Sequence, residues 1–408
     1  MILFIDITID ITIDITITMG IKSFSKVFKS LGSIKWADLR GKTIAIDAMT
    51  EIYRASLGTK SLTTLTDTNG KPTIHINVIL SMIINLREND VGQIWVFDFD
   101  RNRDTNEPFH NPAKLLELKK RADRRKKTQQ AIDDLESDSS DSEYELVTSS
   151  ELNKIEQEKN NKLEKLKKRV FVPDEQINDV KLILNLLGVR YVEAPSGYEG
   201  EHIASMLNRM GVVHGVYSGD TDVIPYGASH LYRKNIRDKK IYHYSQQDIF
   251  EQVKKELKHE VTLNTIIKLG VILGCDMAKK TPRVGPKTIF KKFSSIEYTE
   301  EQKHAIKEFE KTPNEQDIII SNEDNTRFSG IEVEQLLEWL VNEKGFSQDR
   351  IKKQLSRIID FNNEPPTAIS PADLIKRKKP ARVKKQPVKK QPVKKTKKPR
   401  KKKVIVFD

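Results

Sequence analysis

Residues 43–48, TIAIDA, decide the fold of this chain, because they form a short run typical of a buried strand that ends on a carboxylate. The run is rich in β-branched residues and follows Gly and polar residues. Similar runs occur at 94–98, 189–194 and 215–219, with helix-period stretches among them at 76–87, 174–187 and 199–209. Strands that alternate with helices predict an α/β fold with a mostly parallel central sheet flanked by helices.

The composition of these 408 residues limits the kinds of metal site and of binding partner that the chain can have. The single cysteine, Cys275, excludes intrachain disulfides and cysteine-rich zinc sites, so any metal must be held by oxygen ligands. Lys and Arg total 71 against 58 Asp and Glu, and the tail 376–403 holds 17 basic residues and no acidic ones. This balance suits a polyanionic partner, with a solubilising surface as the alternative. No apolar run reaches the roughly 20 residues of a membrane helix, so no membrane partner is expected.

Six carboxylates follow the predicted strands. They are Asp47, Asp98, Glu199, Glu201, Asp220 and Asp222. In an open parallel sheet, residues beyond the carboxyl ends of the strands share one crevice. Crowded carboxylates repel one another unless cations lie between them, and oxygen-only sites suit Mg²⁺, with Mn²⁺ as a substitute. Two such ions about 4 Å apart promote phosphodiester hydrolysis. The alternative is that each acid, taken alone, is a turn residue or a helix cap.

A charged region separates the second and third predicted strands. Its flanks have helix-forming composition, and an acidic, serine-rich segment lies between them. Because it has few apolar residues, we expect two helices that project from the sheet and a disordered loop over 133–148. Downstream, a helical pattern over 246–294 is interrupted by TPRVGPKT at 281–288, whose Gly-Pro pair predicts a tight turn. Residues 332–358 predict two more helices around Gly345.

Five groups of motifs, taken together, point to a known family. They are MGIKSF (19–24), IAIDAMTEIY (44–53) with WVFD (95–98), APSGYEGEHIA (194–204), YSGDTDVIPYG (217–227) and LGCDMAKKTPRVGPKT (273–288). With them, the chain resembles the flap endonuclease/XPG family of structure-specific 5′ nucleases from residue 19 to about 358. The resemblance implies a PIN-like 5′-nuclease fold and two-metal hydrolysis of DNA at single-strand/double-strand junctions. It also implies 5′–3′ exonuclease activity and roles in DNA replication and repair.

The resemblance assigns roles to individual residues. The implied metal ligands are Asp47, Asp98, Glu199, Glu201, Asp220, Asp222 and Asp276. The projecting helices resemble the family's helical arch, where Lys114 and Arg121 align with two basic catalytic residues that steer the scissile phosphate. Their i, i+7 spacing places both on one helical face. Tyr53 matches an aromatic residue that stacks on a base, with a buried core tyrosine as the alternative.

The segment RVGPKT at 283–288 resembles the hairpin of the family's helix–two-turn–helix region. In the family this hairpin holds K⁺ through backbone carbonyls and a duplex phosphate through amides. The implied DNA contacts are Gly20, Tyr53, Gly285, Lys287 and Thr288. Arg283 departs from the family, because it stands at the position of the first glycine.

Two further departures concern the glutamate motif and the C-terminus. Gly197 and Tyr198 are extra residues before the paired glutamates. The last residues, VIVFD, do not fit the sliding-clamp box that family members often carry, so clamp binding is not predicted and a monomer is expected. The basic tail is expected to contact phosphates and to serve as a nuclear signal. We therefore expect a nuclear, intracellular protein, or one in a cytoplasmic viral DNA compartment if the chain is viral.

The chain is expected to divide into six regions. These are a dispensable repeat extension (1–18), an N-terminal nuclease region (19–110), a helical arch (111–172), an internal nuclease region (173–245), the helix–two-turn–helix and C-terminal helices (246–360) and a disordered basic tail (361–408). The repeat ITIDITIDITIT carries acids and lacks a basic n-region, which excludes a signal peptide. We expect the functional chain to begin at Met19.

Two other functions compete with this reading. WVFDFDRN resembles the Asp-x-Asp motif of haloacid-dehalogenase phosphatases, with Asp98 as nucleophile and Asp100 as acid. However, Asn102 stands where that motif requires Thr or Val. An inactive DNA-binding scaffold is the other alternative, although every implied metal position is a carboxylate.

Overall fold

The computed structural model describes residues 20–57, 66–98, 173–235, 238–321 and 332–358, together with isolated helical positions between 123 and 157. The chain divides into two units, Met1–Ala368 and Ile369–Asp408, and the described residues all belong to the first. The predictions for the repeat, most of the arch and the basic tail lie outside the described residues. Asp133 and Asp134 are helical, and Gln130 Nε2 donates to Asp134 Oδ1. The first two positions of the predicted loop 133–148 are thus helical, and the rest of that loop lies outside the described residues.

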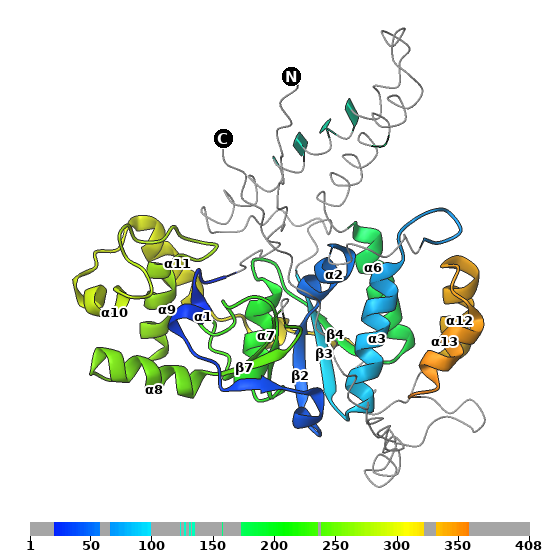
Figure 1. Ribbon diagram of the computed structural model, residues 1–408, viewed down its shortest axis with the longest axis horizontal. Coiled ribbons are helices and arrows are strands. Elements are labelled where there is room, and N and C mark those ends of the chain that lie inside the picture. Colours follow the sequence, from blue (N-terminus) through cyan, green and yellow to red (C-terminus); the bar gives the residue numbers. More distant parts are fainter. Residues whose placement is uncertain are drawn as a thin grey trace, which may run out of the picture. The chain divides into compact units, whose positions relative to one another are not determined.

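Among the described residues, one eight-stranded sheet forms the centre of the first unit (Figure 1). Its order is β1 (Gly32–Ile34), β7 (Ile241–Ser245), β6 (His230–Lys234), β5 (Gly215–Tyr217), β2 (Thr43–Asp47), β3 (Gly92–Phe97), β4 (Arg190–Glu193) and β8 (Ile320–Ser321). The strands from β6 to β4 are parallel, and the pairings at both edges are antiparallel. The four predicted strands and their parallel arrangement are confirmed.

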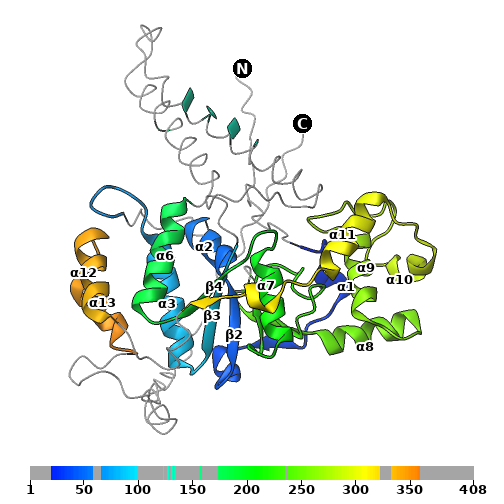
Figure 2. The same cartoon turned by 180° about the vertical axis from the view of Figure 1, so that it is seen from behind.

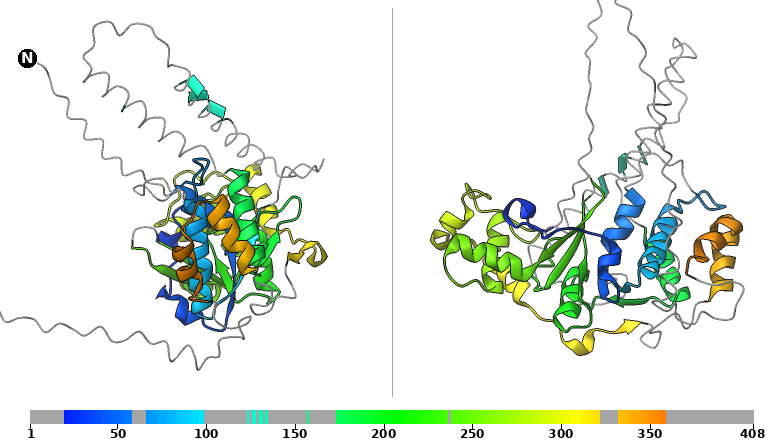
Figure 3. Two further views of the ribbon diagram at one scale, coloured as in Figure 1. Left: turned by 90° about the vertical axis from the view of Figure 1, so that its right-hand side faces the viewer. Right: turned by 60° about the horizontal axis from the view of Figure 1, so that its bottom comes forward.

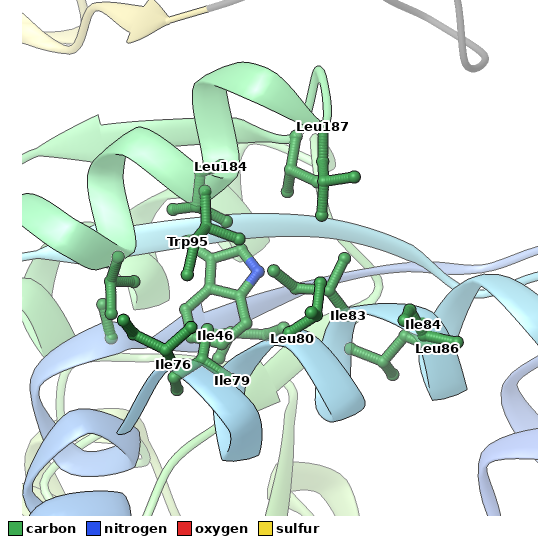
Figure 4. Close-up of a cluster of buried hydrophobic side chains, with 14 of the residues drawn as sticks. Ile46, Ile76, Ile79, Leu80, Ile83, Ile84, Leu86, Trp95, Leu184 and Leu187 are labelled. Carbon is green, nitrogen blue, oxygen red and sulfur yellow. The ribbon is translucent and has the colours of Figure 1, made fainter. Parts of the chain in front are cut away.

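Alternate strand residues face two separate cores. Ile46 and Trp95 belong to one cluster, whereas Ala45 and Val96 belong to the other. The helices of the first face are α2 (Ala48–Leu57), α3 (Ile74–Glu88), α6 (Asp174–Leu186), α12 (Val333–Glu338) and α13 (Gln348–Leu355). Figure 4 shows the Trp95 indole among isoleucine side chains of α3 and leucine side chains at the end of α6. This apolar layer covers one side of the sheet.

The second face carries another group of helices. They are α7 (Gly200–Arg209), which packs on β2, β3 and β5, and α8 (Gln246–Leu257), α9 (Leu263–Leu273), α10 (Ile289–Lys292) and α11 (Glu300–Glu310). Figures 2 and 3 show the two groups of helices on opposite sides of the sheet. The shorter helices are α1 (Phe24–Val27), η1 (Trp36–Leu39), η2 (Phe293–Ser295), η3 (Glu315–Asp317) and η4 (Trp339–Glu343). None of the helices in the described part of the chain is long and apolar enough to cross a bilayer.

A buried polar triad joins the C-terminal helices to α3 and α6. Asp179 Oδ2 lies 3.0 Å from His75 Nε2, and Asp179 Oδ1 accepts from Lys344 Nζ at 2.9 Å. Removing one partner leaves the opposite charge buried, so we expect Asp179→Asn to lower the free energy of unfolding by about 3 kcal/mol in urea denaturation. Glu175→Gln breaks an exposed pair with Lys71 and is expected to cost less than about 1 kcal/mol. Equal losses would contradict burial as the cause.

Three histidines cluster beside β5, β6 and β7: His214 precedes β5, His230 begins β6 and His243 lies in the middle of β7. The rings of His214 and His230 stack 4.6 Å apart, and His243 Nε2 lies 3.0 Å from His230 Nδ1. Burial, reinforced by nearby Lys42, lowers the pKa of His214 to about 4, and burial with His230 lowers the pKa of His243 to about 4.

In the folded protein, the imidazoles of this cluster stay neutral at pH values where the same imidazoles in the unfolded chain already bind protons. The melting temperature should therefore fall as the pH drops from about 6.5 to 4. We expect His243→Asn to flatten this slope and the exposed His304→Asn to leave it unchanged. A wild-type slope in His243→Asn would contradict the prediction.

Candidate active site

The carboxyl ends of β5, β2, β3 and β4 lie side by side at one edge of the sheet. Asp47 ends β2, Asp98 follows β3, Glu199 and Glu201 follow β4, and Asp220 and Asp222 follow β5. The topology thus brings the six predicted carboxylates to a common edge. The seventh, Asp276, stands in a turn after α9 that begins with Gly274 at φ +91°.

Asp47 is held by donors from two elements. Its Oδ1 accepts from the Thr50 amide at 2.9 Å, and its Oδ2 accepts from the Thr50 hydroxyl and from Ser218 Oγ at 2.6 Å. Ser218 Oγ in turn accepts from the Asp220 amide at 2.8 Å. This chain of bonds fixes the orientation of Asp47 relative to Asp220. Thr50 and Ser218 are not among the predicted site residues, although each stands within three residues of a predicted acid.

Asp98 reaches across to the glutamate segment. Its Oδ1 accepts from the Gly200 amide at 2.8 Å, and a Cβ on Gly200 would lie 3.0 Å from that oxygen. Glu199 is the N-cap residue of α7, and Glu201 lies in its first turn. The inserted Gly197 adopts φ +86° with open space around it, so a turn absorbs the two extra residues. The glutamates therefore flank the amide that binds Asp98.

Gly20 lies directly against the aspartate pair. It adopts φ +78°, and a Cβ at this position would lie 2.2 Å from Asp220 Oδ1 and 2.8 Å from Asp222 Oδ1. The next amide, that of Ile21, donates to Thr221 Oγ1 at 2.8 Å. Only a residue without a side chain fits this approach. The predicted DNA contact at Gly20 is thus part of the carboxylate site.

Asp220 is buried, and acids from other elements act on its charge. Burial raises the pKa of Asp220 to about 7; the bond from the Asp222 amide opposes this rise, and the charges of Asp276, Asp47 and Glu199 add to it. Like charges in a buried site favour the protonated form unless a cation neutralises them. The site is therefore electrostatically prepared for a cation.

The donor set fits hard divalent cations, because all seven side chains are carboxylates. In the described part of the chain, no three His, Cys, Asp or Glu side chains are placed to hold a metal ion by themselves. Mg²⁺ commonly keeps several waters and binds through one or two carboxylates plus substrate phosphates, so it needs no closed protein cage. The arrangement suits hydrated cations whose remaining coordination positions are filled by a phosphodiester of the substrate.

The remaining predicted residues fall on α2 and on the arch. Tyr53 is half-buried against the first core, so it remains a candidate for both base stacking and core packing. Glu51, which is buried, and Arg54 form an ion pair next to Tyr53 in the chain, and neither residue is among the predicted site residues. Lys114 and Arg121 lie outside the described residues.

The predicted hairpin lies between α9 and α10. Arg283 adopts φ +58°, the left-handed conformation that glycine accepts more readily. The Thr288 amide donates to the Gly285 carbonyl at 2.9 Å, and the Gly285 amide donates to Thr288 Oγ1 at 3.1 Å. Lys287 is exposed. Arg283 therefore takes the backbone conformation that a glycine would supply, and the turn is closed by hydrogen bonds.

Comparisons with known proteins agree with this fold. Family models of the XPG N-terminal domain and the XPG I-region match residues 19–128 and 188–276. Flap endonuclease 1 of Methanocaldococcus jannaschii is 27% identical over 359 residues, which cover 84% of this chain and 95% of the relative. Flap endonuclease 1 of Glycine max is 28% identical over 370 residues, which cover 83% and 86%. The solved structure of flap endonuclease-1 from Methanococcus jannaschii has the same fold, with a TM-score of 0.58 at 23% identity over 82% of this chain and 96% of that one. The two XPG models and the flap endonuclease relatives support the flap endonuclease/XPG family, whose members are metal-dependent nucleases, as the family that this chain resembles.

Proposed function

We propose that this chain is a structure-specific 5′ nuclease that cuts DNA phosphodiester bonds at 5′ flaps. It would also act as a 5′–3′ exonuclease on nicked or gapped duplex, in DNA replication and repair. The main support is the placement of acids after four adjacent strands at one edge of the sheet, with Gly20 directly against Asp220 and Asp222. The relatives with similar sequences are named flap endonuclease 1, which favours the flap substrate within the family.

Two Mg²⁺ ions, or Mn²⁺ in their place, would bind between the carboxylates. The proposed ligands are Asp47, Asp98, Glu199, Glu201, Asp220, Asp222 and Asp276. Such ions polarise the scissile phosphate and supply hydroxide from water at neutral pH. The chain's own part is to orient the ligands, because hydroxyl groups hold Asp47 and the Gly200 amide holds Asp98.

The duplex would bind at the hairpin between α9 and α10. Lys287 is exposed there, and the turn carbonyls would hold K⁺. Gly285 and Thr288 would lie at the phosphate contact and shape the turn, since the amides of both donate within it. The protein would act as a monomer in the nucleus or in a cytoplasmic viral DNA compartment, without a sliding clamp.

We expect Lys114→Ala and Arg121→Ala each to slow single-turnover cleavage of flap DNA about tenfold, because a positioned cation stabilises the developing phosphate charge. Lys119→Ala provides a matched control, since it removes the same charge from another face of the predicted helix. Its rate should stay close to that of the wild type. Equal slowing in all three variants would indicate a general charge effect instead of steering.

Cleavage of end-labelled flap, nicked, gapped and bubble DNAs, with and without Mg²⁺, tests the proposed function. We expect Mg²⁺-dependent cleavage near the junction of flap DNA that leaves a 5′-phosphate and a 3′-hydroxyl. A small phosphomonoester tests the phosphatase alternative and should not be hydrolysed. If an Asp220→Asn, Asp222→Asn double variant matched the wild type in all activity, including any trace cleavage, the inactive-scaffold alternative would be favoured.

A further inference from the structure

A row of four aromatic rings lies beside the candidate metal ligands, and we call it the aromatic stack: Tyr198, His202, Tyr226 and Phe309. The His202 ring lies 4.2 Å from that of Tyr226 in a stacked arrangement, and 5.1 Å from that of Tyr198 in an edge contact. Tyr226 contacts Phe309 of α11 at 4.9 Å. His202, Tyr226 and Phe309 are each 4% exposed, so these three members of the stack lie in the interior.

The two central rings belong to the segments that carry the acids. His202 follows Glu201 directly, and its amide donates to the Glu199 carbonyl at 3.1 Å. The Tyr226 amide donates to the Asp222 carbonyl at 3.0 Å. Contact between these rings therefore connects the glutamate segment on α7 to the aspartate segment after β5.

A second contact fixes His202 from the side of α11. Its Nε2 lies 3.0 Å from the Lys311 carbonyl, which can only accept, so Nε2 carries a hydrogen. Close by, Ser205 Oγ donates to the Glu201 carbonyl at 2.6 Å and approaches the Val223 carbonyl at 3.1 Å. The spacing between the two acid segments is thus set by buried contacts, with His202 at their centre.

We propose that His202 is a positioning residue for the metal site. Its ring, clamped between Tyr198 and Tyr226 and bonded to Lys311, sets the distance between the glutamates and Asp222, and with it the affinity for divalent metal. The inserted Tyr198 supplies the outer ring of this clamp. The inference rests on the proposed function in one respect, namely that these carboxylates bind the metal.

The test compares Mn²⁺ binding to the DNA-free full chain, by calorimetry, with the Mg²⁺ dependence of flap cleavage. We expect His202→Ala to weaken Mn²⁺ binding about tenfold, as loss of a residue that orients metal ligands commonly does. The Mg²⁺ concentration for half-maximal cleavage should rise by a similar factor, while the rate at saturating Mg²⁺ recovers. His202→Phe keeps the stacked ring and should restore most of the affinity, and the exposed His304→Ala on α11 is the control.

Two results would overturn this role. One is a folded His202→Ala variant that binds Mn²⁺ as tightly as the wild type. If that variant does not fold, Tyr198→Ala removes the outer, half-exposed ring instead, and wild-type Mn²⁺ affinity there would reject the clamp. Failure of the proposed function is a separate observation, because it appears as a wild-type chain that binds Mn²⁺ but cuts none of the DNAs.

Discussion

Asp220→Asn is expected to reduce Mg²⁺-dependent DNA cleavage by at least about 10³-fold and, at the same time, to stabilise the metal-free protein. Charge stabilisation by a bound metal is worth several kcal/mol, which corresponds to this loss in rate. The gain in stability has a different origin. Asp220 is 2% exposed and has like charges around it, so its ionised form disfavours the folded state. The amide removes that charge, and its oxygen can still accept from the Asp222 amide.

The pKa of Asp220 gives the sign and size of this stability change. Its folded value of about 7 lies above the ordinary 3.8, so stability falls as the pH rises through that interval. At pH 8 the difference corresponds to at most about 4 kcal/mol, and it disappears below pH 4. Thermal melting in EDTA at pH 8 should therefore show a higher melting temperature for Asp220→Asn than for the wild type.

The control removes an exposed charge. Glu256→Gln on α8 should leave both the melting temperature and cleavage unchanged. Added Mg²⁺ should raise the melting temperature of the wild type and have little effect on Asp220→Asn. An Asp220→Asn protein that melts at or below the wild-type temperature in EDTA would show that the acids are not crowded.

Gly20→Ala is expected to lower cleavage by about 100-fold with the acids themselves intact. The new Cβ would lie 2.2 Å from Asp220 Oδ1, so the aspartate pair or the chain at residue 20 must move. A displacement of about 1 Å in a catalytic site can cost this much in rate. The measurement is single-turnover cleavage of flap DNA at several Mg²⁺ concentrations.

A second glycine separates this clash from backbone strain. Gly211 has a similar φ of +75°, but a Cβ there would meet nothing within 4 Å. Gly211→Ala should cost about 1 kcal/mol of stability and leave cleavage unchanged. Similar losses of cleavage in both variants would mean that conformational strain, and not contact with Asp220, is responsible.

The central sheet and the positions of the acids could be predicted from the sequence because both depend on local patterns. Short apolar runs that end on Asp mark β2 and β3, and parallel pairing then brings the acids to one edge. The edge strands escaped prediction for the opposite reason. Strand β8 has only two residues and β1 only three, so neither has a periodicity to detect.

The bonds that orient the site could not be predicted, since they join residues far apart in the chain. Ser218 and Asp47 are separated by 171 positions, and Ile21 and Thr221 by 200. Arg283 is a different case. An arginine in place of the family's glycine suggests that the turn has changed, but the backbone of Arg283 still adopts the left-handed conformation. Local residue type therefore predicted the turn's position better than its geometry.

The order of the ligands along the chain has a consequence for protein synthesis. The Lys22 amide donates to the Gly274 carbonyl at 2.8 Å, so the first described residues dock beside Asp276, the last of the acids to be translated. During synthesis, Asp47 and Asp98 leave the ribosome before the segment around Gly274 has been made. Until then, the segment around Lys22 has nothing to pack against. Incomplete or prematurely terminated chains would therefore carry several of the acids without a working centre. Because the ligands are dispersed along the chain, the proposed metal centre can be assembled only by the complete fold.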